Sequence, residues 1–341
     1  MSTRRKILIL SGAVFLVFVF VALGVGLFWI SPARKGVEPQ LVVIAEGESP
    51  AQVAEDLHKR GIISSRRLFL LWVKALGLGG GIKAGEYSLG PEMTPAAIME
   101  KLTKGLIFKH PVTIPEGFTR LQIANLLSEH CFVNKEKFLA LTQDPEVMKR
   151  YGIEGLNLEG YLFPDTYLFG RGVSAQTIVD VMVKRFLQLT APLRKLAEEK
   201  GLKMEEVVIL GSIIEKETGL PQERPLIASV FLNRLKKGMR LESDPTVIYG
   251  LEDFNGNLRK KDLAQETPYN TYVIQGLTPG PISNPGLESM RAVLQPAETD
   301  YLYFVSRNDG SHQFSKTLSE HNRAVGVYQK KKNSTAAKKA S

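Results

Sequence analysis

Hydrophobic and polar positions divide the chain into an apolar N-terminal run and a longer region of amphipathic elements. Residues 7–30 form 24 consecutive positions without a charge, rich in Val, Leu and Phe. A helix rising about 1.5 Å per residue makes this run about 36 Å long, enough to cross a hydrocarbon core of about 30 Å. A cleaved signal peptide has a shorter apolar stretch, about 7–15 residues, and a small-residue cleavage site. The run and the Pro- and Lys-containing segment 31–35 after it therefore favour a membrane anchor.

The charges on either side of the apolar run predict its orientation. Three positive residues (4–6) precede the run, whereas two (34–35) follow it. The more positive flank of a membrane span stays on the cytoplasmic side, so we expect residues 1–6 in the cytoplasm and the remaining chain outside. The chain has one cysteine. An exterior chain so poor in cysteine fits a bacterial envelope better than a eukaryotic secretory route.

After a polar stalk at residues 31–40, three units each combine a strand, a Gly- or Pro-containing turn and a capped helix. Ser49-Pro50 and Thr94-Pro95 each place an N-cap residue before a proline at the first helical position, a common helix start. The expected strands are 41–45, 85–89 and 112–114, and the expected helices are 50–60, 65–76, 95–104 and 119–129. Short units of this kind predict a small α+β module.

The first of these units has a Val-rich strand, the turn Glu46-Gly47-Glu48-Ser49 and a helix. In this order of elements it resembles the LysM-type modules that bind amino-sugar polymers. A generic spacer domain is the alternative. We expect residues 41–110 to form a LysM-like module.

Beyond Asn134 the helices become longer, and the loops between them are rich in Pro and Gly. The segment 278–286 contains three prolines and is predicted to be neither helix nor central strand. A strand at 301–306 and a return strand at 312–315 flank Asn308-Asp309-Gly310, a strong hairpin signal. The expected helices are 135–142, 174–189, 191–200, 204–218 and 222–237. The predicted fold class is α+β: a single N-terminal transmembrane helix, a small LysM-like module and a larger mixed α+β domain.

Composition and charge narrow the possible functions. The chain is 44% hydrophobic and 23% charged, as in globular proteins, and its formal net charge is +9. Residues 4–6 and the lysines of the C-terminal tail carry most of this excess, which leaves residues 7–329 at +1. We therefore expect no nucleic-acid partner. Cys131 is the sole cysteine, and the histidines lack metal-site spacing, so we expect no disulfide, metal or cofactor.

One helix, at residues 204–219, places a glutamate among apolar residues. At 100° per residue, Glu217 falls near the middle of an apolar arc about 120° wide. Lys216 projects to the opposite side, and Glu215 lies beyond the edge of the arc. The apolar members of the arc are Val207, Leu210, Ile213 and Ile214.

A carboxyl group in apolar surroundings responds with a raised pKa. A glutamic acid that keeps its proton near neutral pH is what the general acid of a glycosidase requires. The alternative is structural: Glu217 pairs with Arg224, Arg234 or Arg240 and only closes its helix.

Several downstream and upstream segments carry the amide, hydroxyl and aromatic side chains that suit sugar recognition. Rings would cover the apolar faces of sugars, and amide or carboxylate groups would bind hydroxyl and N-acetyl groups. Each segment alone could equally be core or turn. The candidate substrate-binding residues are Glu159, Asp244, Tyr269, Asn270 and Asn284.

Six segments together resemble the bacterial endolytic murein transglycosylase family, also called YceG-like. They are SIIEKETG at 212–219, NRLKKGMRLESDPTVIYG at 233–250, YNTY at 269–272, GLTPGPISNPG at 276–286, YLYFV at 301–305 and the closing His312 with His321-Asn322. The similarity extends from the anchor to about residue 328, and its motifs are long and ordered.

The resemblance implies a single-pass inner-membrane protein with a LysM-like module and a periplasmic catalytic domain. It implies cleavage of the MurNAc–GlcNAc bond within nascent peptidoglycan strands, giving 1,6-anhydroMurNAc ends and limiting strand elongation. The partners implied are peptidoglycan glycan strands, cell-wall synthases (penicillin-binding proteins) and membrane lipid. The catalytic residue implied is Glu217, with Asp244, Tyr269 and Asn270 as candidates for holding the sugars. The expected parts are a cytoplasmic N-terminus (1–6), a transmembrane helix (7–30), a stalk (31–40), a LysM-like module (41–110), the catalytic domain (111–328) and a basic, disordered tail (329–341).

Two other functions fit parts of the sequence, and a third is disfavoured. A non-catalytic peptidoglycan-binding scaffold for synthases would use the module and not Glu217. A plain muramidase-type hydrolase would need Asp244 or Glu159 as a second carboxylate. A pyridoxal-phosphate lyase is disfavoured, because Lys216 points to the polar side of its helix and no phosphate loop is present.

Overall fold

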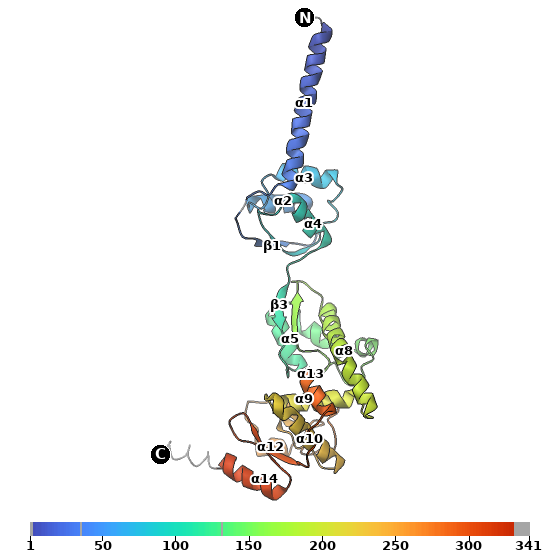
Figure 1. The fold of residues 1–341 in the computed structure, drawn as a ribbon, viewed down its shortest axis with the longest axis vertical. Coiled ribbons are helices and arrows are strands. Elements are labelled where there is room, and N and C mark those ends of the chain that lie inside the picture. Colours follow the sequence, from blue (N-terminus) through green and yellow to red (C-terminus); the bar gives the residue numbers. More distant parts are fainter. Residues whose placement is uncertain (1–2, 35, 131, 331–341) are drawn as a thin grey trace, which may run out of the picture. The chain divides into compact units, whose positions relative to one another are not determined.

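The computed structural model describes residues 3–34, 36–130 and 132–330 (Figure 1). Two expectations concern residues outside this part. One is that Cys131, the sole cysteine, forms no disulfide, and the other is that the lysine-rich tail is disordered. The chain forms two compact units. The first comprises residues 1–110 with 168–172, and the second comprises residues 111–167 with 173–341. Each is described by itself below.

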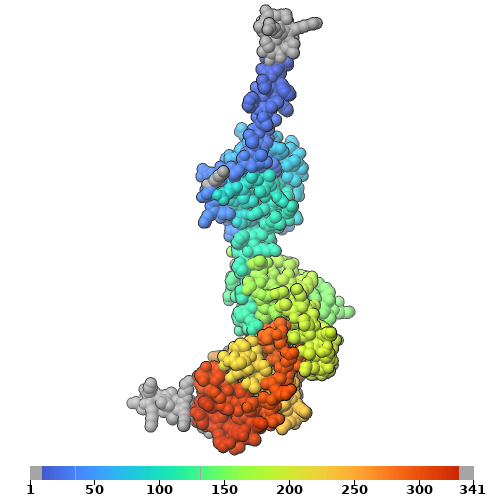
Figure 2. All heavy atoms as spheres, in the orientation of Figure 1, coloured from blue at the N-terminus to red at the C-terminus, as the bar shows by residue number. Residues whose placement is uncertain are grey.

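The first unit begins with the long helix α1 (Thr3–Ile30). Over Leu10–Ile30 this helix is long and apolar enough to cross a membrane. Most of its length carries uncovered apolar side chains, such as Phe18 at 69% exposure, and Figure 2 shows it standing clear of the rest of its unit. Near its end, Trp29 stacks on Trp72 with ring centroids 5.3 Å apart.

The rest of the first unit alternates strands and helices as the sequence predicts. Strand β1 pairs antiparallel with β2, so that Gln40 lies opposite Leu89 and Ile44 opposite Gly85. Ser49 and Thr94 cap their helices with side-chain oxygens, as expected. The elements are β1 (Gln40–Ile44), α2 (Pro50–Lys59), α3 (Arg66–Ala75), β2 (Gly85–Leu89) and α4 (Pro95–Lys104). Their core consists of buried residues that include Val42, Leu57, Phe69, Tyr87 and Leu102.

The second unit is mostly helical, and it contains a two-stranded antiparallel sheet in which Tyr303 lies opposite Ser315. A further two-stranded sheet pairs β3 with β4, and residues 111–113 and 166–167 of these strands belong to this unit. The elements are β3 (His110–Thr113), α5 (Arg120–Glu129), α6 (Lys135–Leu141), α7 (Pro145–Arg150), β4 (Thr166–Phe169), α8 (Ala175–Glu199), α9 (Met204–Glu217), η1 (Pro221–Glu223), α10 (Arg224–Lys236), α11 (Asp244–Gly250), α12 (Lys260–Leu263), α13 (Leu287–Leu294), β5 (Tyr303–Ser306), β6 (His312–Ser315), α14 (Leu318–Val325) and η2 (Gly326–Lys330). These elements and those of the first unit confirm the α+β class.

Helix α9 lies at the centre of the second unit and carries the candidate glutamate. Every residue from Val207 to Ile214 is buried, because α8, α10, α11 and α13 all pack against this helix. Figure 2 shows the yellow segment of α9 against the red-orange chain near residue 290, although about 80 residues separate them. A helix that is apolar on all sides is typical of a buried core element.

Two expectations about helices in this unit are wrong. The segments 174–189 and 191–200 form one helix, α8, with Pro192 inside it. A proline removes one backbone hydrogen bond from a helix, but the buried residues on both sides of Pro192 hold α8 together by packing. The segment 222–237 begins as a short 3₁₀ turn, η1, before α10.

We expect Gly211→Ala to destabilise the second unit. A Cβ at Gly211 would lie 3.0 Å from Cγ and 3.3 Å from the backbone of Met290, so α13 would have to move away from α9. Overpacking of this kind costs about 1–3 kcal/mol, more than the gain in helix propensity. Denaturant unfolding measures it, with Gly326→Ala as the control, since that glycine has open space and a helical φ of −58°. Equal stability of the two variants would refute the packing argument.

Candidate active site

Glu217 is the last residue of α9 and lies on the wall of a pocket of about 400 Å³. The Oγ of Ser243 donates a hydrogen bond of 2.5 Å to Oε1 of Glu217. Asp244, Tyr272 and Phe304 line the same pocket. The site therefore combines a carboxyl group, a second acidic residue and aromatic side chains in one cavity.

Burial raises the pKa of Glu217 to about 7. The negative charge of Asp244 acts in the same direction, whereas the hydrogen bond from Ser243 favours the ionised form and opposes it. The position at the C-terminal end of α9 also disfavours a negative charge, because the helix dipole is negative there. Glu217 thus holds its proton near neutral pH and is able to give it up.

The neighbouring Glu215 has a different environment. Its side chain is only 6% exposed, forms an ion pair of 3.2 Å with Arg224 and accepts a hydrogen bond of 2.9 Å from the backbone N–H of Gly286. Glu215 thus lies among polar partners and outside the apolar arc, although its side chain is buried as well. What distinguishes the two glutamates is the partner: no ion pair to Glu217 exists among the residues that the structure describes.

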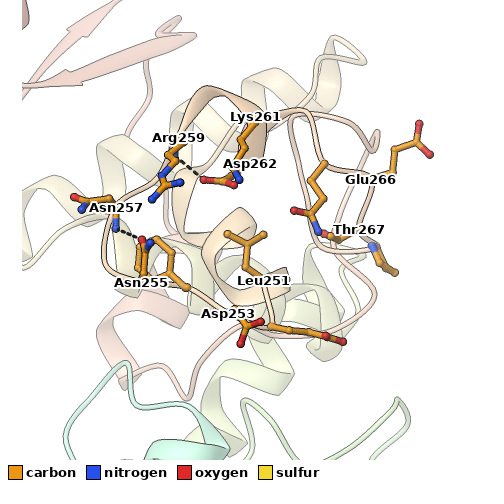
Figure 3. A pocket seen from close by; sticks show the side chains of 14 residues that line it. Leu251, Asp253, Asn255, Asn257, Arg259, Lys261, Asp262, Glu266 and Thr267 are labelled. Atoms are coloured by element: carbon orange, nitrogen blue, oxygen red, sulfur yellow. Dashed lines mark hydrogen bonds between the residues drawn. The ribbon is translucent and has the colours of Figure 1, made fainter.

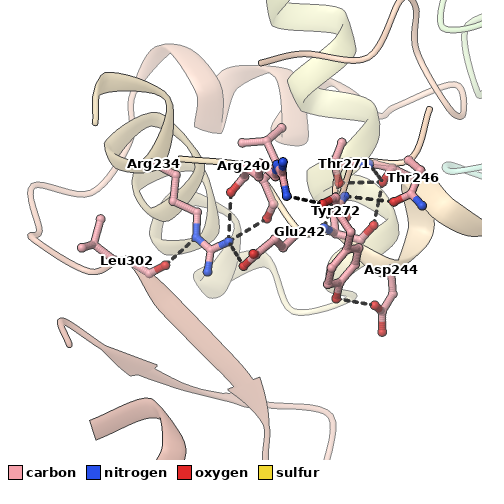
Figure 4. A network of polar contacts seen from close by, with 11 residues as sticks. Arg234, Arg240, Glu242, Asp244, Thr246, Thr271, Tyr272 and Leu302 are labelled. Atoms are coloured by element: carbon pink, nitrogen blue, oxygen red, sulfur yellow. Dashed lines mark hydrogen bonds and ion pairs between the residues drawn. The ribbon is translucent and has the colours of Figure 1, made fainter. Parts of the chain in front are cut away.

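A buried arginine, Arg234, shapes the loop that leads to Ser243 (Figure 4). Its guanidinium donates to the backbone carbonyls of Arg240, Leu241 and Leu302, and it pairs with Glu242 at 2.9 Å. Glu242 has a φ of 51°, a left-handed conformation that is strained for a non-glycine residue. Strain of this kind persists where surrounding contacts enforce it, often at functional sites.

Asp244 is exposed at the N-terminal end of α11, directly after the loop. The hydroxyl of Tyr272 donates a hydrogen bond of 2.7 Å to its Oδ1 (Figure 4). Burial and the charge of Asp244 raise the pKa of Tyr272, so its phenol stays protonated and remains the donor. This contact orients the Asp244 carboxylate at the pocket that also holds Glu217.

Comparison with known proteins finds a matching family model and similar sequences. The model of the YceG-like family matches residues 42–326. The chain belongs to the YceG-like family. It is 36% identical over 306 residues to the endolytic murein transglycosylase of Bacillus subtilis, with 85% of each chain covered. It is 30% identical to the endolytic murein transglycosylase of Streptococcus pneumoniae over 84% of this chain and 58% of that one.

A crystal structure of a YceG-like protein from Listeria monocytogenes is also similar. The sequence identity is 38% and the TM-score is 0.60, with 84% of this chain and 98% of that chain covered. The resemblance carried by the six sequence segments is thus confirmed as membership of the YceG-like family.

The five candidate substrate-binding residues occupy different places in this YceG-like chain. Asp244 lies in the pocket of Glu217, whereas Asn270 and Asn284 are fully buried. The Asn270 amide donates to the carbonyls of Leu263 and Gln265, which fixes the loop before Tyr272. These two amides therefore hold loops in place.

Glu159 and Asn284 form a separate buried cluster. Asn284 donates 2.8 Å to Glu159, which also accepts from the backbone N–H of Arg120 and from the hydroxyl of Tyr249. Burial raises the pKa of Glu159 to about 7, against these hydrogen bonds. Tyr269 packs edge-to-face on Tyr249 at 4.8 Å, beside this cluster. Glu159 and Tyr269 thus lie apart from the pocket of Glu217.

The sequence did not predict Ser243, which donates to Glu217, as a site residue, nor several residues that line the pocket, among them Tyr272, His312 and His321. The motif segments that carry the family resemblance contain all four, which was the available signal. Ser243 precedes Asp244, and Tyr272 closes the YNTY segment. Their convergence depends on loop conformations that no periodic pattern encodes.

A larger cavity, about 510 Å³, lies at the other end of α11 (Figure 3). Its labelled side chains include acidic Asp253 and Glu266 and basic Arg259 and Lys261, all exposed. None of the described acidic side chains that line it is buried. The smaller pocket of Glu217 is therefore the candidate active site.

We expect Ser243→Ala to move the alkaline limb of the pH–activity profile to higher pH. Its hydroxyl stabilises the ionised form of Glu217, so its loss raises the pKa of the general acid. A hydrogen bond to a charged group is worth roughly 1.5 kcal/mol, about one pH unit. Profiles of kcat measure the shift. Ser289→Ala is the control, because Ser289 is buried and its Oγ has no partner among the described residues; a shift in the control alone would contradict the assignment.

Proposed function

We propose that this chain is a membrane-anchored endolytic lytic transglycosylase of peptidoglycan. The observation that carries the proposal is Glu217, a carboxyl group with a pKa of about 7 on the wall of a pocket lined by aromatic and polar side chains. A general acid works best when its pKa lies near the working pH. The name of the Bacillus subtilis relative, endolytic murein transglycosylase, agrees with this chemistry.

A single carboxyl group performs both proton transfers in the proposed reaction. Protonated Glu217 donates its proton to the oxygen that links MurNAc to GlcNAc, and the bond from that oxygen to C1 of MurNAc breaks. The resulting carboxylate then takes the proton of the C6 hydroxyl of the same MurNAc as its oxygen bonds to C1. The products are a 1,6-anhydroMurNAc end and a new GlcNAc end, and no water is consumed.

Asp244 is suited to stabilising the transition state of this reaction. Cleavage of the glycosidic bond builds positive charge on the sugar ring. A carboxylate oriented by Tyr272 in the same pocket as Glu217 supplies a fixed opposite charge, the kind of preorganised electrostatics that enzymes use. Asp244 would also serve as the second carboxylate of a muramidase-type hydrolase, which is therefore the second candidate function.

Helix α1 supports the anchoring part of the proposal. Its apolar side chains are exposed around the helix, a surface that water disfavours and lipid accommodates. The stacked Trp29 and Trp72 lie at its C-terminal end, and tryptophan is enriched at membrane–water interfaces. We place residues 1–6 in the cytoplasm, and the part of the first unit after residue 30 together with the second unit on the periplasmic side of the inner membrane.

The remainder of the first unit is proposed to act as a LysM-like module that binds glycan strands near the membrane. Its antiparallel β1–β2 pair and capped helices give the strand–turn–helix order on which that resemblance rests. Anchored catalysis beside penicillin-binding proteins would cut strands as they are extended and so limit their length.

Mass spectrometry of the products tests the proposed reaction. The full chain in detergent is incubated with uncrosslinked glycan strands, and the new ends are analysed. We expect internal cleavage with 1,6-anhydroMurNAc ends. Reducing MurNAc ends, heavier by one water, would show a hydrolase, and the absence of new ends would show a non-catalytic scaffold.

A further inference from the structure

A histidine on the wall of the Glu217 pocket has no role in the proton transfers described above. His321, from α14, lines this pocket, and its ring stacks on Tyr303 at 5.3 Å. Arg234 lies over the same Tyr303 ring at 5.1 Å. The imidazole is therefore held by aromatic packing on one face, and its residue lines the cavity.

The two ring nitrogens of His321 are in different situations. Nδ1 is buried and has no hydrogen-bond partner among residues 3–34, 36–130 and 132–330. A buried N–H without an acceptor is rarer in proteins than an acceptor without a donor. The neutral ring is therefore expected to leave Nδ1 unprotonated and to carry its proton on Nε2.

The charge environment favours the neutral ring. Burial lowers the pKa of His321, and the nearby positive charge of Arg234 lowers it further, while Glu242 opposes this effect. His321 thus presents a neutral N–H donor at neutral pH. A neutral donor suits an uncharged acceptor oxygen such as an amide carbonyl.

We propose that the Nε2–H of His321 binds the acetamido carbonyl oxygen of an amino sugar in this pocket. Leu241, Phe304 and Val305 line the same cavity and provide apolar surface for the acetamido methyl group. The pocket therefore selects N-acetylated sugars, because a free amine would bring a charge and no carbonyl. This inference rests on the proposed function for its substrate class.

A binding experiment tests the inference without any cleavage. Uncrosslinked glycan strands, and the same strands after de-N-acetylation, are titrated into the full chain carrying Glu217→Gln. Adding His321→Phe keeps the stack on Tyr303 and removes both ring nitrogens. We expect about tenfold weaker binding of N-acetylated strands, equivalent to about 1.4 kcal/mol, and no change for de-N-acetylated strands.

Stability and two further variants separate binding from folding. His321→Phe removes a buried, unpartnered nitrogen, so its thermal midpoint should be unchanged or higher. His321→Gln, which restores an N–H donor, should recover part of the affinity. His130→Phe is the matched control, because His130 also stacks on an aromatic ring, Phe132, at 6.3 Å and is exposed.

Unchanged binding in His321→Phe, or an equal loss for both kinds of strand, would overturn the inference. A wild-type cleavage rate in Glu217→Gln would instead overturn the proposed function. Because the titrations measure affinity alone, these two failures are distinguishable.

Discussion

Replacing Glu217 with Gln is expected to lower the rate of glycan cleavage by about 10³-fold or more. The amide has nearly the same shape and accepts the hydrogen bond from Ser243, but it provides no proton for the glycosidic oxygen and no base for the C6 hydroxyl. Both proton transfers therefore lose their catalyst. The appearance of new strand ends, followed by chromatography and mass spectrometry, measures the loss.

The same variant is expected to lose activity but to gain stability at high pH. The gain in stability serves as its folding control. The pKa of Glu217 is raised from 4.5 to about 7, so the folded state binds the proton more tightly than the unfolded state. The wild-type free energy of unfolding therefore falls as pH rises through this range, by up to about 3 kcal/mol. Glu217→Gln removes this loss and should be the more stable protein at pH 8. Wild-type turnover in the purified variant would exclude Glu217 as the catalyst.

Replacing Glu215 with Gln is expected to reduce the free energy of unfolding by about 3 kcal/mol. The side chain of Glu215 is 6% exposed and that of its partner Arg224 is 11% exposed. Removing one member of a buried ion pair costs about 3–5 kcal/mol, because the other charge is left uncompensated. Glu116, 3.4 Å from Arg224, compensates part of this charge, which places the expected loss at the lower end.

Denaturant unfolding at neutral pH measures this loss. Glu288→Gln is the matched control: Glu288 pairs with Arg291 at 3.3 Å, but both side chains are about half exposed, and such pairs are worth about 0–1 kcal/mol. Equal stability of the two variants would contradict a structural role for the Glu215–Arg224 ion pair. Together, Glu217→Gln and Glu215→Gln separate a catalytic glutamate from a structural one two residues away.

Local signals in the sequence predicted most elements of the fold. Ser49 and Thr94 cap helices that begin where the N-cap and proline signals place them, because capping depends on residues within one turn. The hairpin at 308–310 joins β5 and β6, which lie within the predicted strands 301–306 and 312–315. The sequence predicts a break between residues 189 and 191, but the chain continues as one helix, α8, because tertiary packing overrides the low helix propensity of Pro192.

The candidate site was only partly predictable. The helical wheel selected Glu217, but it also placed Glu215 outside the buried surface. α9 is buried on all sides, and the partner of Glu215, Arg224, comes from the next helix. Ser243 reaches Glu217 only because Arg234 holds the intervening loop with Glu242 at positive φ. Such long-range contacts leave no periodic signal in the sequence.

The titration of Glu217 itself tests the central claim most directly. Carboxyl ¹³C chemical shifts of glutamate-labelled protein, recorded from pH 3 to 9 and compared with Glu217→Gln, identify the signal of this one group. The account predicts a midpoint near 7 for the signal that the variant lacks. A midpoint near 4.5, the value of an ordinary glutamate, would show a carboxylate that has already lost its proton and cannot start the reaction.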